Sequence, residues 1–129
     1  MSKISDSSVI DALRRQMTIA VAKQVASAGN LANVDTPGYK AKEVTFSDAL
    51  RSKLASPSNS TFPASRTSGP AVDVTVKDAE GLPARRDGNT VQLDRELLNM
   101  GRAAGDFSAA QTALAAKFRL VRYAINEGK

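Results

Sequence analysis

The chain has 129 residues, lacks Cys, His and Trp, and carries a formal net charge of +5. This length fits one domain of ordinary size. The missing side chains exclude Ser-His-Asp and Cys-His catalytic systems, thiolate or imidazole metal sites, iron–sulfur clusters and disulfides. Because only 5% of the residues are aromatic, we expect a core of small and aliphatic side chains, as in closely packed helices. Most catalytic chemistry is therefore excluded, and we expect no cofactor and no metal site.

The positive charge would allow a nucleic-acid partner, but it is spread along the whole chain. The only adjacent basic pairs are Arg14-Arg15 and Arg85-Arg86, and no aromatic residue lies between or beside them to stack on a base. We therefore expect no nucleic acid among the partners. A basic helical adaptor or nucleic-acid-binding protein is the alternative from a different functional class.

The first predicted element is a long amphipathic helix over residues 5–33, with Ser5 and Asp6 as candidate N-caps. Thr36 precedes Pro37 and is disfavoured in the helical region, so the helix should end near Asn33. Pro37 and Gly38 then supply the fixed φ and the positive φ of a type II turn. The apolar stripe of this helix, with spacings of mostly three and four, consists of Ile10, Leu13, Met17, Ala20, Val21, Val25, Ala28 and Leu31.

Charged residues interrupt the first twenty positions at Asp6, Asp11, Arg14 and Arg15. No continuous apolar region of a secretory signal is present there. No stretch approaches the ~20 apolar residues that a membrane-spanning helix needs. We expect neither a cleaved signal peptide nor direct membrane insertion.

The middle of the chain is polar. Residues 56–70 consist mostly of Ser, Thr, Pro and Gly, which predicts a mobile loop. Val72, Val74 and Val76 alternate with polar residues, the pattern of a half-buried strand. We expect a small β element of two or three strands.

A second long helix is predicted over residues 93–127, with a heptad pattern sustained for more than four repeats. Gly101 and Gly105 lie inside it, and each costs roughly 1 kcal/mol of helix propensity relative to Ala. We expect close approach of another helix to compensate for this cost. The heptad positions are Leu93, Leu97, Met100, Ala104, Phe107, Gln111, Leu114, Phe118, Val121 and Ile125.

The predicted fold class is mainly α, with the two long helices packed as a coiled-coil hairpin around a small irregular or β middle. We expect one structural domain with three parts, residues 1–35, 36–90 and 91–129. One narrow stripe on each helix gives a small core, so contacts with neighbouring subunits would supply further burial. A free-standing helical hairpin and a dimeric coiled coil are alternatives that periodicity alone leaves open.

Residues 30–46, NLANVDTPGYKAKEVTF, resemble the N-terminal signature of the flagellar axial proteins, the family of rod and hook subunits. The end of the chain, with its heptad helix, is similar to subunits of the proximal rod. The residues that match the shared turn motif are Ala32, Asn33, Thr36, Pro37, Gly38 and Tyr39.

The resemblance implies a non-enzymatic structural subunit of the bacterial flagellar basal-body rod, which serves motility. Such a subunit polymerises through its terminal helices into the proximal part of a hollow, torque-transmitting axle in the periplasmic space. It is a type III export substrate without a cleaved signal. Its partners are other copies, other rod proteins, and membrane-ring and export-gate components at the rod base. Another flagellar rod subunit is the alternative within the family. The predicted assembly seam consists of Ile10, Leu13, Met17, Val21, Val25, Leu93, Leu97, Met100, Phe107, Leu114, Phe118, Val121 and Ile125.

Overall fold

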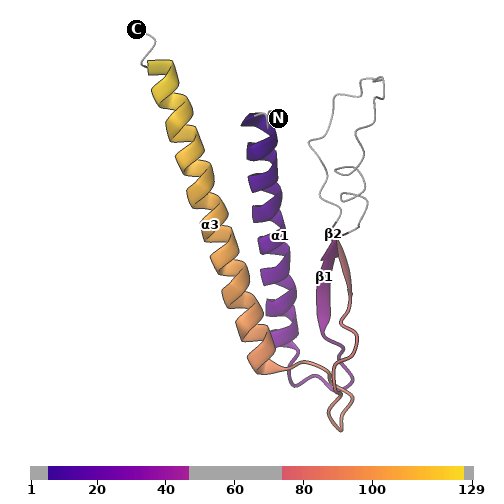
Figure 1. Cartoon of the computed structure of the whole chain (residues 1–129). Helices are drawn as coiled ribbons and strands as arrows, with labels where there is room; N and C mark the ends of the chain where they lie inside the picture. The colour runs from indigo at the N-terminus through magenta and orange to yellow at the C-terminus, as the bar shows by residue number, and fades with distance from the viewer. Residues whose placement is uncertain (1–5, 47–73, 127–129) are drawn as a thin grey trace, which may run out of the picture.

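The computed structural model describes residues 6–46 and 74–126, which form two long helices and a two-stranded sheet. The elements in chain order are α1 (Asp6–Ala32), β1 (Lys42–Phe46), β2 (Val74–Asp78) and α3 (Leu93–Asn126). Figure 1 shows α1 and α3 running antiparallel beside each other, with the sheet beside α1. The predicted mainly α class, with a helical hairpin and a small β element, is confirmed. The predicted loop at residues 56–70 lies outside the described residues.

Both helices end close to the predicted positions. The amide of Asn33 donates to the carbonyl of Gly29 at 3.2 Å, and the amide of Val34 donates to Leu31 at 3.2 Å, which tightens the last turn of α1. At the other helix, Asp94 and Glu96 occupy the first turn, where carboxylates interact favourably with the helix dipole.

The contact between the helices is built mainly from small residues. Ala20 and Ser27 are buried on α1, seven residues apart, and Ala103 and Ala110 are buried on α3 with the same spacing. Ala103 is only 1% exposed. The Nζ atom of Lys117 lies 2.6 Å from Oδ1 of Asp6 and pairs the start of α1 with the far part of α3. The buried spacing of seven is that of a coiled-coil seam.

The sheet is an antiparallel pair in which Val44 of β1 faces Val76 of β2. Val44 is buried, whereas Val76 is 57% exposed. Of the valines that alternate in the predicted strand, only Val74 is half-buried, and Val72 lies outside the described residues. The physical reason is that β1 provides most of the contact with α1, so β2 forms the outer edge. Neither described helix is long and apolar enough to cross a membrane.

Candidate functional site

The turn after α1 has the geometry that the motif requires. The amide of Tyr39 donates to the carbonyl of Thr36 at 3.3 Å and closes a four-residue turn. Gly38, at the third position, has a φ of 72°. A type II turn needs positive φ at this position, and Gly adopts it without strain. The turn therefore directs the chain out of α1 toward β1.

Asn89 closes the end of α1 from a distant part of the chain. Its Nδ2 donates to the carbonyls of Asn33 at 2.9 Å, Val34 at 3.1 Å and Thr36 at 2.8 Å. Its Oδ1 accepts from the amide of Val91 at 2.7 Å. The side chain is fully buried. Because carbonyls at a helix C-terminus lack partners within the helix, Asn89 acts as a cap that also fixes the segment leading into α3.

Asn30 attaches β1 to α1. Its Nδ2 donates to the carbonyl of Lys42 at 2.8 Å, and its Oδ1 accepts from the amide of Lys42 at 2.7 Å. The hydroxyl of Tyr39 donates to the same Oδ1 at 3.4 Å. The Asn30 amide thus pairs with both backbone groups of one residue, as a residue of a neighbouring antiparallel strand would. This fully buried side chain sets the position of the sheet relative to the helix.

The segment before α3 pairs with the motif turn through its backbone. The amide of Gly38 donates to the carbonyl of Asp87 at 2.8 Å, and the amide of Thr90 donates to the carbonyl of Tyr39 at 3.0 Å. Gly88 has a φ of 81°, and its Cα hydrogens face the backbone of Gly38; a Cβ there would lie 3.5 Å from the Gly38 Cα. The turn and this segment therefore form one hydrogen-bonded unit.

Arg85 completes the connection between the two helices. Its Nη2 donates to the carbonyl of Val34 at 2.7 Å and to that of Val91 at 3.2 Å. We call the assembly of Asn30, residues 36–39 and residues 85–91 the junction. Every buried side-chain nitrogen and oxygen of the described residues has a hydrogen-bond partner. Such complete pairing makes the junction a rigid joint between α1, the sheet and α3.

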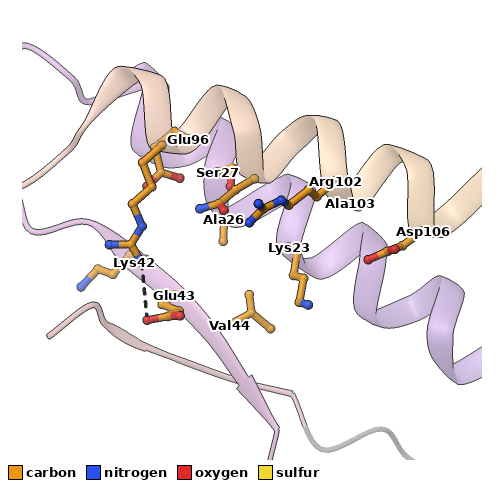
Figure 2. A pocket seen from close by; sticks show the side chains of 12 residues that line it. Lys23, Ala26, Ser27, Lys42, Glu43, Val44, Glu96, Arg102, Ala103 and Asp106 are labelled. Atoms are coloured by element: carbon orange, nitrogen blue, oxygen red, sulfur yellow. Dashed lines mark ion pairs between the residues drawn. The ribbon is translucent and has the colours of Figure 1, made fainter.

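A small pocket lies between the sheet and the helices, next to the junction (Figure 2). Its volume is about 240 Å³, and its walls carry charges of both signs, including Lys23, Arg102 and Asp106. Arg95 and Glu43 form an ion pair across it at 4.0 Å. The charged side chains thus gather on the side of the helical hairpin that faces the sheet. Among the described residues, no group of acidic side chains has the arrangement of a metal site.

The two strands are joined at one end by an exposed pair of Lys42 and Asp78. The hydrogen bond with Asp78 raises the pKa of Lys42, and the same bond lowers the pKa of the Asp78 carboxyl. Exposed pairs of this kind contribute little to folding. The pair therefore orients the sheet edge more than it stabilises the fold.

The predicted seam residues fall into two groups. One group is half-buried near the helix contact, and the other is exposed. After Ala20, the next buried residue of α1 is Ser27, whereas Val21 and Val25 between them are exposed. The reason is that small residues occupy the contact, so large side chains beside it point away. The half-buried residues are Ile10, Leu13, Met17, Met100, Phe107 and Leu114, and the exposed ones are Val21, Val25, Leu93, Leu97, Phe118, Val121 and Ile125. Their role in assembly stays a prediction.

Sequence reasoning found the motif turn but missed its partners Asn30, Arg85, Asn89 and Thr90. Asn30 lies next to the apolar stripe without belonging to it, and Asn89 and Thr90 follow a turn signal at Asp87-Gly88. A turn signal immediately before a predicted helix was therefore the one available indication.

No family model matches the chain. It is similar to several proteins named flagellar basal body rod protein FlgB. The Salmonella typhimurium protein is 35% identical over 94 residues, which are 62% of this chain and 65% of that protein. The Bacillus subtilis protein is 27% identical over 95% of this chain and 97% of its own length. The Escherichia coli protein is 26% identical over 87% of this chain and 88% of its own length. These relatives share one name across distant bacteria, and the chain is similar to FlgB rod proteins over most of its length.

Proposed function

We propose that the chain is a structural subunit of the flagellar basal-body rod, which polymerises through its terminal helices into the proximal part of the torque-transmitting axle. The observation that supports this most is the similarity to FlgB proteins over nearly the whole chain. A structural role is also supported by the junction, where buried polar atoms bind one another. We infer that the chain is not an enzyme.

The junction fits the mechanical role. An axle that transmits torque needs a fixed angle between the elements of each subunit. Asn89 and Arg85 hold the end of α1 against the segment that enters α3. These bonds join positions more than fifty residues apart in the chain. Torsion applied to one helix would therefore be passed to the other without a flexible linker.

The partners that we propose are other copies of this chain, other rod proteins, and ring and export-gate components at the rod base. Large apolar side chains exposed on both helices support a role for neighbouring subunits. In a single copy such surface is in contact with water, and burial against a neighbour would stabilise it.

We further propose that the chain is located in the periplasmic part of the rod, after type III export with its N-terminal residues retained. Ile10, Leu13 and Met17 are half-buried, and Asp6 pairs with Lys117. Cleavage within the first twenty residues would remove these contacts. Mass spectrometry of the chain from purified basal bodies should therefore recover the peptide that contains Asp6.

Deleting the gene that encodes this chain from its own bacterium tests the proposed function. We expect non-motile cells whose basal bodies lack rods, and a plasmid copy should restore both. Purified basal bodies should contain the chain. Complete rods in the deletion strain would refute the proposal, and salt-dependent DNA binding by the purified chain would favour the adaptor alternative.

A further inference from the structure

The two broad sides of the helical hairpin differ in chemical character. Because α1 and α3 are antiparallel, residues one position after the buried ones point to the same side of the pair. This side is opposite the charged pocket and the sheet. Its exposed residues beyond Arg14 include no ionisable group, and we call them the uncharged face; the exposed Arg14 lies on the same side of α1, one turn before Thr18, and marks the edge of this face. The residues of the uncharged face are Thr18, Val21, Val25, Ala28 and Ala32 on α1, and Leu97, Gly101, Ala104, Ser108, Gln111 and Ala115 on α3.

Small side chains make much of this face shallow. A Cβ built at Gly101 would meet nothing within 4 Å, so this glycine does not serve a close contact inside the chain. We expected close approach of another helix to compensate for the low helix propensity of Gly101. Helix α1 does not provide this contact. A helix from outside the chain would find room between Ala28 and Ala104, next to the existing contact of α1 with α3.

A separate segment of α3 has the opposite character. The ion pair between Lys117 and Asp6 places the first described turn of α1 beside Lys117, and α3 continues to Asn126. We call residues 118–126 the tip. Leu120 is 64% exposed and Ile125 is 70% exposed. The other large apolar residues of the tip, Phe118, Val121 and Tyr123, are exposed as well. Apolar side chains on several sides of one helix are typical of a helix that is buried in its working state.

We propose that the tip of one copy packs on the uncharged face of the next copy, as a third helix beside α1 and α3. This inference rests on the proposed rod function and specifies its contact between copies. Large side chains of the tip would fill the depression over the small residues Gly101 and Ala104, in the way that knobs fill holes in a coiled coil. The residues of the uncharged face carry no charge that the tip would have to desolvate, and the long side chain of Arg14 at its edge can stay in solvent. The side chains of Arg119 and Arg122 are long enough to reach solvent at the rim.

The contact joins two different surfaces, which decides how the assembly grows. Each copy has one free tip and one free face, so addition can continue without closing into a dimer.

The dimensions of the contact follow from helix geometry. Ala104 and Val121 are 17 residues apart, which is about 26 Å along a helix. Copies that run in the same direction would be staggered by roughly this distance. The nine-residue tip is only about 14 Å long, so a single contact is smaller than the ~800 Å² per partner of stable complexes and should hold only in the assembled rod.

The absence of cysteine allows a direct test by disulfide crosslinking. Ala104→Cys places one thiol on the face, and Ala124→Cys places one on the tip. The two variants would be co-expressed in the deletion strain, one with a tag that shifts its gel mobility, and isolated basal bodies would be oxidised. We expect crosslinks between the tagged and untagged forms, several-fold above those with Ala109→Cys, an exposed position on the other side of α3. Crosslinks only between identical variants, or equal crosslinking with Ala109→Cys, would overturn the proposal.

A second variant removes the dependence on crosslinking. Gly101→Leu improves helix propensity by nearly 1 kcal/mol but fills the low surface of the face. We expect the purified variant to be at least as helical as the wild type, while its incorporation into rods falls several-fold. Normal incorporation would refute the contact. If rods form without the chain at all, the proposed function fails; if rods need the chain but tolerate Gly101→Leu and lack the crosslink, only the present inference fails.

Discussion

Replacing Asn89 by Ala should destabilise the junction more than any other single truncation of a polar side chain. The side chain is fully buried and makes four hydrogen bonds to backbone groups. Its loss uncouples the end of α1 from the start of α3. We therefore expect the variant to unfold at lower temperature and to fail to assemble into rods.

The loss of folding stability in Asn89→Ala follows from the hydrogen-bond partners that its backbone contacts keep. The amide of Val91 would lose its acceptor in a buried site, which costs about 1–3 kcal/mol. The three carbonyls lose one donor each but keep another, so together they add only about 1 kcal/mol. The total of roughly 2–4 kcal/mol corresponds to a decrease in Tm of about 7–15 °C for a domain of this size. The remaining donors to the carbonyls of Asn33, Val34 and Thr36 are the Thr36 amide, the Arg85 guanidinium and the Tyr39 amide.

Thermal unfolding followed by circular dichroism measures this loss. Asn99→Ala is the matched control, because it makes the same chemical change at a half-buried position on α3. Asn89→Asp tests the direction of the bonds: its carboxylate keeps the acceptor for Val91 but faces three carbonyl oxygens, so we expect a larger loss than with Ala. Equal Tm values for Asn89→Ala and Asn99→Ala would refute the reasoning.

Three further predictions concern the turn, the sheet and the helix contact. Gly38→Val and Gly81→Val both place a branched residue at a φ of 72°, but only Gly38→Val should abolish rod assembly in basal-body micrographs, because only Gly38 bonds to Asp87. Equal defects would contradict this. Lys42→Met should raise the pKa of Asp78 toward its ordinary value in an NMR titration, since the hydrogen bond that lowers it is lost. In the wild type the contribution of Asp78 to stability is present at neutral pH and is lost as pH falls through its lowered pKa. Leu114→Asp should be expressed but absent from rods, because a half-buried charge opposes the helix contact; its normal incorporation would show that this row is not a packing surface.

Local signals in the sequence were sufficient for the helix boundaries. Pro37 ends α1 by stereochemistry that does not depend on the rest of the fold. The long heptad pattern likewise predicted α3 to within one residue of its end. The face of each helix that is buried was harder to predict, because large residues such as Leu97 were given more weight than Ala103. Hydrophobicity favours the larger side chain, whereas close helix approach selects the smaller one.

The junction shows why the site was only partly predictable. The motif turn at residues 36–39 has its own local chemistry, so it could be found from the sequence. Asn30 and Asn89 are ordinary polar residues whose role depends on which backbone groups lie beside them in the fold. A side chain that binds a carbonyl more than fifty positions away leaves no periodic pattern. Only the folded chain identifies it.

The pairing of Phe46 with Val74 has a consequence for how proteins with this fold can diversify. It places Phe46 and Val74, the residues that flank positions 47–73, next to each other in the sheet, away from the junction. An inserted segment whose ends already meet adds little to the free energy of closing the chain: doubling its length costs only about 0.6 kcal/mol. That is well below the cost of losing Asn89. Evolution can therefore lengthen, shorten or replace the segment between Phe46 and Val74 while the same helical hairpin is retained.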